Sequence, residues 1–445
     1  MKKILVIAYN IPPEPTTTAN RLGKIMKYLK KDWQIHVLSP VDEGNLGEGI
    51  IVDSVRTWYP QAIANAIHKL KILEKFFEWF FPFWGEPAFF WVMPALWQAR
   101  KFIKQNKPDL IVVFMMPYSL GIIGIILKWI TGLPLVLNFD DSPTCDDMHP
   151  IFYSWVHYRL TLAMENFYIR QADAVIYVSQ RNLNRVRDRQ PQQHQSKFYL
   201  VRYGADPADF TDVPIRSDDN FTITYTGAMA GWFEFYRTPE EQTFLRKLYQ
   251  VWIKLGRYET AKLDYRSASP MFVGKAVQEI LAENPKWQGK INVNIYGNLF
   301  PEYVVKRALQ NENLTDIVSV FSPVPLSKSI ELACQSDLLF MTLPARPFRS
   351  LPGGRISAKT YEYLMTARPI LAAVSKGENS DYMEDKPGVW LVEPTDIYAM
   401  KKVIIQLAST KFSGKRLNFD RRSIHVEYSY ENIAKQFNEV LKYVL

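Results

Sequence analysis

The chain has 445 residues, of which 47% are apolar and 22% charged, so its composition is that of a globular protein with about two to three domains and excludes a disordered chain. Its two cysteines, Cys145 and Cys334, are too far apart to form a disulfide framework or a metal motif, and they indicate a cytoplasmic protein. The net charge of +9 favours anionic partners such as nucleotide phosphates or lipids, but no zinc spacing, helix-turn-helix or RNA-binding motif points to nucleic acid.

The first 39 residues have the pattern of a strand, a proline-rich turn, a helix and a second strand. This order is typical of a parallel sheet and opens an α/β fold. Ligands of such sheets bind at the carboxyl ends of the strands, so we expect the loop of residues 10–21 to contact a ligand. The alternative is that this loop only connects two elements.

Residues 63–97 are unusually rich in phenylalanine and tryptophan. A helix here would carry an apolar stripe of Leu73, Phe76, Phe77 and Phe80, with lysines and glutamates on its other side. Two interpretations stay open. The helix either covers the sheet as part of the core, or it lies in a membrane surface with its aromatic side chains in the bilayer and its lysines at the headgroups.

Before residue 140 the pattern predicts helices at 95–105 and 119–131 and strands at 110–114 and 134–138. A lysine, a glycine and a proline interrupt the apolar run 120–139, so we expect no membrane span there. Asp140 and Asp141 follow the last of these strands. They either cap the next turn, or one of them orients or deprotonates an acceptor hydroxyl.

A second α/β pattern begins after a helix at 158–171, a strand at 174–179 and a polar linker at 212–220. Its first strand, 221–226, ends at Gly227, which serves either a tight turn or the close approach of a phosphate. Residues 232–269 are predicted to be an insertion. Further helices and strands alternate at 269–282, 291–296, 302–310, 317–321, 327–335 and 338–343.

Residues 351–374 have the arrangement of a phosphate site: Gly353 and Gly354, a polar turn with Arg355, a helix at 358–365 and a buried strand at 370–374. Glycines let the backbone approach an anion, and the first turn of a helix presents free N–H groups to it.

Two charged side chains follow on one side of this helix. Lys359 adds a cation in its first turn, and Glu362, three residues later, can bind a ribose diol with both oxygens. The alternative is an ordinary turn followed by a surface ion pair.

This segment resembles the donor-site signature of family 4 glycosyltransferases of the GT-B fold, in which a Lys and then a Glu precede the pattern Y-L-x-x-x-x-P-I-L-A. Two other stretches are similar to the same family: residues 165–179, with the pattern E-x6-A-D-A-V-I-x-V-S, and residues 197–210, KFYLVRYGADPADF. The resemblance extends over most of the chain apart from about 55–95 and 232–269.

The resemblance implies two Rossmann-like domains whose parallel sheets face each other across a cleft, with a C-terminal helix that crosses back to the first domain. We expect an acceptor domain at 1–212, completed by 425–445, and a donor domain at 213–424.

The implied site has a donor and an acceptor part. Glu362 would hold the ribose of a nucleotide-diphosphate sugar, Lys359 and Arg355 its diphosphate, and Asp141 the acceptor. The other implied donor-binding residues are Gly227, Gly353, Gly354, Ser357, Ala358, Ser322 and Val324; on the acceptor side they are Thr17, Arg21 and Asp140.

The implied reaction is sugar transfer with retention, without a metal or a further cofactor. No Asp-x-Asp ends a strand of the donor half, which agrees with metal independence. The acceptor would be a glycan or a lipid-linked molecule of envelope polysaccharide or glycolipid synthesis. The enzyme would work at the inner face of the cell membrane, in contact with it through residues 63–97.

Three departures from the family pattern keep a second interpretation open. Gly354 stands where the family has the first Glu of its Glu-x7-Glu motif, no Arg/Lys clamp follows Gly227, and threonines replace the glycines of the first loop. They favour a non-catalytic GT-B protein that acts as a membrane-associated assembly partner. A nucleotide-sugar epimerase would need paired carboxylates and a histidine around the sugar, a set that the sequence does not assemble.

Overall fold

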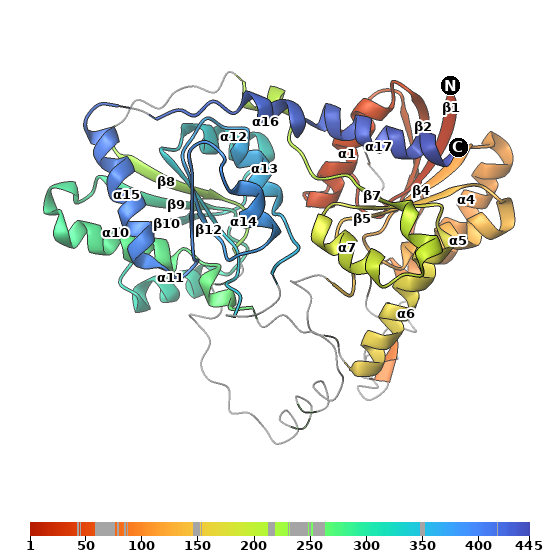
Figure 1. Ribbon diagram of the computed structural model, residues 1–445, viewed down its shortest axis with the longest axis horizontal. Helices are drawn as coiled ribbons and strands as arrows, with labels where there is room; N and C mark the ends of the chain where they lie inside the picture. Colours follow the sequence, from red (N-terminus) through yellow and green to blue (C-terminus); the bar gives the residue numbers. More distant parts are fainter. Residues whose placement is uncertain are drawn as a thin grey trace. The chain divides into compact units, whose positions relative to one another are not determined.

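The computed structural model describes residues 1–445 except 42–43, 45, 58–75, 78–79, 84–85, 87, 146–151, 153, 212–218, 230, 232–247, 249–250, 252–262, 348–351 and 416. The chain divides into two compact units (Figure 1). Unit 1 contains Met1–Gly204, Gln242–Thr260 and Tyr430–Leu445; unit 2 contains Ala205–Glu241 and Ala261–Ser429. The boundary expected at residue 212 and most of the expected insertion lie outside the described residues.

The described part of unit 1 contains a seven-stranded parallel sheet in the order β3-β2-β1-β4-β5-β6-β7. Its central strands are continuous apolar runs because helices cover both faces of the sheet. The strands are β1 (Lys2–Ile7), β2 (Trp33–Ser39), β3 (Ile50–Ser54), β4 (Leu110–Phe114), β5 (Leu135–Phe139), β6 (Ala174–Tyr177) and β7 (Phe198–Leu200).

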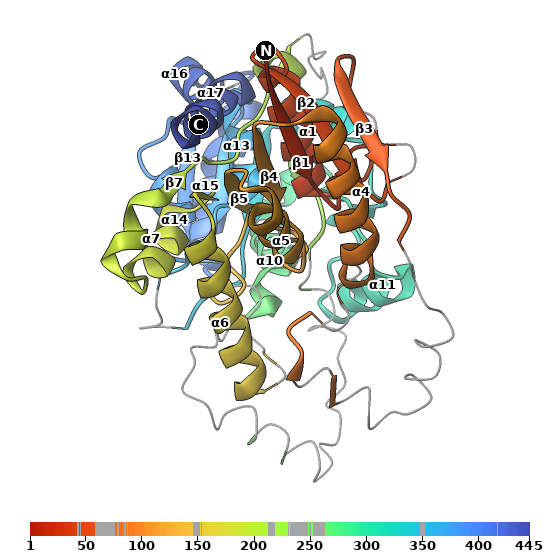
Figure 2. The ribbon, with the colours of Figure 1, turned by 90° about the vertical axis from the view of Figure 1, so that its right-hand side faces the viewer.

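The helices of unit 1 form two layers. One core lies between the sheet and α4, α5, α6 and α7, and a second core lies between the sheet and α1 and α17. Figure 2 shows α4, α5 and α6. The helices are α1 (Thr17–Leu29), α4 (Val92–Asn106), α5 (Leu120–Thr131), α6 (Trp155–Gln171), α7 (Gln180–Asp188) and α17 (Tyr430–Val444), with short 3-10 turns at η1 (Phe89–Trp91) and η2 (Gln192–Lys197).

The C-terminal helix α17 completes the core of unit 1, as the sequence predicts. Phe437 stacks on Phe114 of β4, with ring centroids 6.1 Å apart. Asn438 accepts a hydrogen bond of 2.7 Å from the Trp33 indole.

The described part of unit 2 contains a six-stranded parallel sheet in the order β10-β9-β8-β11-β12-β13. The strands are β8 (Phe221–Thr226), β9 (Ile291–Tyr296), β10 (Val318–Phe321), β11 (Leu338–Thr342), β12 (Ile370–Ala373) and β13 (Val389–Val392). The chain order reverses between β8 and β11. In an open α/β sheet, ligands bind beyond the carboxyl ends of the strands at such a reversal.

The helices of unit 2 include α13 (Ala358–Leu364), close to the bounds expected for it, and α10 and α15, which pack against each other. The other described helices of unit 2, together with the bounds of α10 and α15, are η3 (Pro207–Phe210), η4 (Tyr265–Ser267), α10 (Met271–Glu283), η5 (Pro285–Trp287), α11 (Glu302–Asn311), α12 (Leu326–Gln335), α14 (Glu378–Met383), α15 (Ile397–Phe412) and α16 (Arg422–Glu427).

The observed architecture confirms the expected α/β fold with two parallel sheets. Three strands were not predicted: β3, β7 and β13. All three lie at sheet edges and are partly exposed, so they lack the continuous apolar run that marks a central strand.

Candidate functional site

The turn after β8 requires glycine. Gly227 has φ +126°, and a Cβ on it would overlap with Cε and Nζ of Lys359. Gly297, which follows β9, packs against this turn, since its Cβ would lie 2.7 Å from the carbonyl carbon of Gly227. Residues 227 and 359, both predicted to bind the donor, are therefore neighbours in the structure.

Lys359 lies in the first turn of α13 with its ammonium over this glycine turn. Its Nζ is 5.6 Å from the ring centroid of Tyr225, a geometry in which the ring face attracts the cation. Lys359 forms no ion pair or hydrogen bond with any described residue. Its ammonium can therefore bind an anion beside Gly227.

Glu362 lies one helical turn beyond Lys359 and is partly exposed. Burial raises the pKa of its carboxyl above the ordinary value, and the nearby Lys359 partly offsets this rise. Within the part of the chain that the structure describes, its carboxylate accepts no hydrogen bond. Lys359 and Glu362, both expected to bind the donor, thus keep their polar groups available.

Helix α13 is fixed by residues that the sequence did not single out. The Asn379 Oδ1 accepts hydrogen bonds from the Ser357 N–H (2.9 Å) and the Thr360 hydroxyl (2.8 Å). Tyr363 accepts a bond of 2.9 Å from the Thr226 N–H at the end of β8. These bonds hold the helix against the strand that carries the glycine turn.

The bend before α13 is paired with the residues before α14. Gly353 forms a parallel bridge with Gly377 and accepts a hydrogen bond of 2.8 Å from the Glu378 N–H. Gly354 is buried, and Arg355 is partly exposed. Because the Ser357 N–H is bonded to Asn379, of the two amides expected to bind phosphate only that of Ala358 remains for a ligand.

Ser322 and Val324 follow β10, and Gly227 follows β8, two strands away. All three residues therefore lie beyond the carboxyl ends of the strands. Ser322 is exposed and Val324 partly exposed. The rings of Tyr296 and Phe321, at the ends of β9 and β10, stack beside them with centroids 4.6 Å apart. The loop expected to hold the base thus adjoins an aromatic pair.

On the acceptor side, the structure brings Arg21 and Asp140 together, but as a buried pair. The Arg21 guanidinium lies 3.2 Å from Asp140 and also donates to Asn138 (3.0 Å) and to the Val201 carbonyl (2.9 Å). Arg21 has no exposed surface, and its partners lie at the ends of β5 and β7, which it joins. Thr17, the first residue of α1, is exposed.

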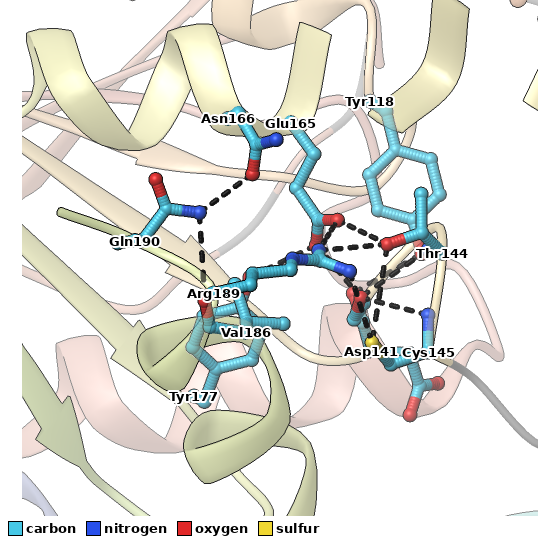
Figure 3. Close-up of polar contacts among 11 residues, drawn as sticks. Tyr118, Asp141, Thr144, Cys145, Glu165, Asn166, Tyr177, Val186, Arg189 and Gln190 are labelled. Carbon is cyan, nitrogen blue, oxygen red and sulfur yellow. Dashed lines mark hydrogen bonds and ion pairs between the residues drawn. The ribbon is translucent and has the colours of Figure 1, made fainter. Parts of the chain in front are cut away.

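Asp141 begins a loop that a buried polar network holds in place (Figure 3). Tyr118 donates a hydrogen bond of 3.1 Å to the Asp141 carbonyl. Glu165, on α6, accepts from Ser142 (2.7 Å) and also bonds Thr144. The loop after β5 is therefore anchored on both sides of its first turn.

Arg189 completes this network, as Figure 3 shows, by lying between Glu165 and the loop. Its guanidinium pairs with Glu165 and donates to the Thr144 hydroxyl (2.7 Å) and to the Cys145 sulfur (3.3 Å). Tyr177 donates a further bond of 3.2 Å to Glu165. Only Glu165 gave a signal in the sequence, as part of a family pattern.

Across the described ranges, no three His, Cys, Asp or Glu side chains lie close enough to hold a metal ion together. No helix among the described residues is both long and apolar enough to cross a bilayer.

Residues 20–209 match the model of Glycosyltransferase Family 4, a match that covers most of unit 1. This part of the chain is similar to family 4 glycosyltransferases. The match does not reach Lys359 and Glu362, and no curated protein sequence matches the chain significantly.

Solved structures that are similar to this chain cover nearly its whole length. HepE of Anabaena in complex with UDP-glucose has 14% identity and a TM-score of 0.60, with 100% of both chains covered. Sucrose-phosphate synthase of Thermosynechococcus elongatus has 12% identity and a TM-score of 0.65, with 100% of this chain and 99% of that one covered. The lipopolysaccharide outer core galactosyltransferase WaaB in its apo form has 12% identity and a TM-score of 0.53, with 100% of both covered. At these identities the likeness establishes the fold, which is GT-B as expected.

Proposed function

We propose that the chain is a glycosyltransferase that moves a sugar from a nucleotide-diphosphate sugar to an acceptor hydroxyl, with retention and without a metal. The observation that carries the proposal is the position of Lys359 over Gly227. A diphosphate needs a backbone that it can approach closely and a cation beside it, and this turn supplies both at a reversal point of the sheet. The UDP-glucose bound to the similar HepE structure supports a nucleotide-sugar donor.

Glu362 supports the same assignment because its carboxylate is available one turn from Lys359. A carboxylate can accept hydrogen bonds from both hydroxyls of a ribose. In the proposed donor complex the ribose lies at Glu362, the diphosphate at Lys359 and Arg355, and the base near Ser322 and Val324.

The proposed reaction places the developing negative charge on the leaving diphosphate. As the bond from the anomeric carbon to the phosphate oxygen breaks, Lys359 and Arg355 stabilise that oxygen. The acceptor oxygen bonds to the same face of the anomeric carbon, and its proton passes to the departing phosphate. No protein nucleophile is needed, and Asp141 orients the acceptor hydroxyl.

The proposed acceptor is a glycan or a lipid-linked molecule of envelope polysaccharide or glycolipid synthesis, reached at the inner face of the cell membrane. The similarity to WaaB, a lipopolysaccharide galactosyltransferase, supports this class. Most of residues 63–97, to which the sequence assigns a membrane contact, lies outside the described residues. Of its aromatic side chains, Phe76 and Phe81 are each 50% exposed.

A thermal-shift panel of UDP, GDP, ADP, CMP and their sugar conjugates tests the donor site. A ligand at 100 times its Kd stabilises the fold by about 2.7 kcal/mol, which raises Tm by a few degrees. We expect a shift with one nucleotide family that Glu362→Ala abolishes and that Glu302→Ala, an exposed glutamate of the same unit, retains. The absence of any shift would favour the non-catalytic GT-B protein, in line with Gly354 at the position of the family's first Glu.

A further inference from the structure

Three neighbouring helices of unit 1 expose large apolar side chains on their outer side. Helix α5 contacts both α4 and α6, and all three cover one face of the sheet (Figure 2). Their inner sides supply the core, so these exposed residues are additional to it. We call them the α4–α6 face, and each is 41–69% exposed: Met93, Trp97, Trp129, Ile130, Trp155 and Phe167.

The exposed side chains form stripes and pairs. Met93, Trp97 and Lys101 follow each other at intervals of four on α4, so they share one side of that helix. The Trp129 ring of α5 contacts the Phe167 ring of α6 edge to face, with centroids 5.9 Å apart. An apolar surface that continues from one helix to the next marks an interaction site, whereas single exposed residues do not.

Cations are interleaved with these apolar side chains. Helices α4, α5 and α6 carry six basic residues and one acidic residue, Glu165, which is buried and paired with Arg189. Lys101 lies 5.9 Å from the Trp97 ring and Arg159 lies 5.8 Å from the Trp155 ring. The described residues of α4, α5 and α6 therefore expose positive charge and no negative charge.

The charges at the end of this layer include one carboxylate, Asp173. Lys128 pairs with Asp173, just beyond α6, at 2.6 Å. Beside them, burial and the charge of Lys128 lower the pKa of Lys197 to about 8.

We propose that the α4–α6 face binds the surface of an anionic lipid bilayer. Tryptophan and methionine side chains enter the headgroup region, and the neighbouring lysine and arginine side chains pair with lipid phosphates. This inference rests on the proposed function for its biological role. It adds to that function the surface by which unit 1 would reach a lipid-linked acceptor.

Charge argues against two other occupants. In a two-fold symmetric dimer the same surface meets itself, so the cations of one copy would lie against those of the other. A nucleic acid would pair its phosphates with the cations. The exposed apolar side chains of Met93 and Ile130 would then have no apolar partner. An anionic bilayer offers a partner to both kinds of side chain.

Vesicle flotation with full-length protein tests the proposal. We expect flotation with vesicles of phosphatidylcholine and phosphatidylglycerol and little with phosphatidylcholine alone. The variant Trp97→Ala/Lys101→Glu should bind the anionic vesicles at least about tenfold more weakly, since it removes an inserting ring and reverses a charge. The matched control is Tyr398→Ala/Lys402→Glu on α15 of unit 2, which removes the same kind of exposed pair, 4.4 Å apart, and should float like the wild type.

Three results would overturn the proposal: a wild type that does not float with either vesicle, a control that loses as much binding as the α4 variant, or a vesicle-free dimer that the α4 variant dissociates in light scattering. The last would assign the face to self-association. Flotation needs no donor and the nucleotide panel needs no vesicles, so the failure of one proposal can be told from the failure of the other.

Discussion

Replacement of Gly227 by alanine should affect stability and donor binding through separate causes. The backbone of Gly227 has φ +126°, where L residues are rare, and such a conformation costs on the order of 1–3 kcal/mol for a non-glycine residue. The added Cβ also overlaps with the end of the Lys359 side chain. We therefore expect Gly227→Ala to lower the free energy of unfolding by about 2 kcal/mol and to move the ammonium away from the turn.

Two further variants separate these causes. Gly414 has φ +79° with nothing within 4 Å of an added Cβ, so Gly414→Ala reports backbone strain alone, about 1 kcal/mol, and should leave nucleotide affinity unchanged. Gly227→Ala/Lys359→Met replaces the displaced ammonium with a shorter, uncharged side chain.

Urea unfolding and calorimetric titration with the nucleotide that the panel identifies provide the measurements. We expect Gly227→Ala to weaken binding at least about tenfold, as one charge-assisted contact is lost. The double variant should bind no more weakly than Lys359→Met alone. A folded Gly227→Ala variant with wild-type affinity would refute the reasoning, because the diphosphate would then not use this turn.

Three other perturbations have expected outcomes. In urea unfolding, Glu165→Gln should lower the free energy of unfolding by about 3 kcal/mol, since it leaves the Arg189 guanidinium unpaired in the network. The control Glu331→Gln, which breaks an exposed pair with Lys328, should cost less than about 1 kcal/mol. Asn379→Ala should cost about 1–3 kcal/mol and weaken donor binding, because the Ser357 N–H and the Thr360 hydroxyl lose their acceptor. As pH is lowered, nucleotide affinity should begin to fall at a pH above 4.5, the ordinary pKa of Glu. The reason is that burial raises the pKa of Glu362 and the ribose needs its ionised carboxylate.

The sign of the last effect can be checked on stability as well. A folded pKa above the unfolded value means that the folded state holds the Glu362 proton more tightly, so this contribution is present at low pH and lost as pH rises through the folded pKa. Glu362→Gln should therefore be at least as stable as the wild type at neutral pH, and its weaker nucleotide affinity should not vary in that pH window. A parallel pH dependence in both proteins would assign the titration to another group.

The sequence was sufficient for the central strands of both sheets and for bringing Gly227 and Lys359 into one predicted site. Central strands of parallel sheets are short apolar runs, and α13 is bounded by a glycine bend and Pro369, so both can be recognised locally. Gly227 and Lys359 are neighbours because the carboxyl ends of the strands of one parallel sheet meet at one edge.

The polar network around Asp141 could not be predicted in the same way. Glu165 lies on α6 and Arg189 caps the end of α7, so their contact depends on how these two helices are placed. The burial of Arg21 with Asp140 had no local signal either, because an arginine in a loop near a ligand site and one in a buried ion pair have the same sequence pattern. Asn379, whose side chain accepts the hydrogen bond from the Ser357 N–H before α13, lies on α14, 22 residues further along the chain, so it had no local signal either.

The place of α17 in unit 1 has a consequence for biosynthesis. Residues 205–429 are translated between the last strand of unit 1 and the helix that covers Phe114 and Trp33. At about 5–20 residues per second this interval lasts roughly 10 to 50 s, during which α1 alone covers part of this apolar face of the nascent first sheet. We therefore expect holding chaperones to protect the ribosome-bound chain, and its second half to reach a native-like state before its first half does.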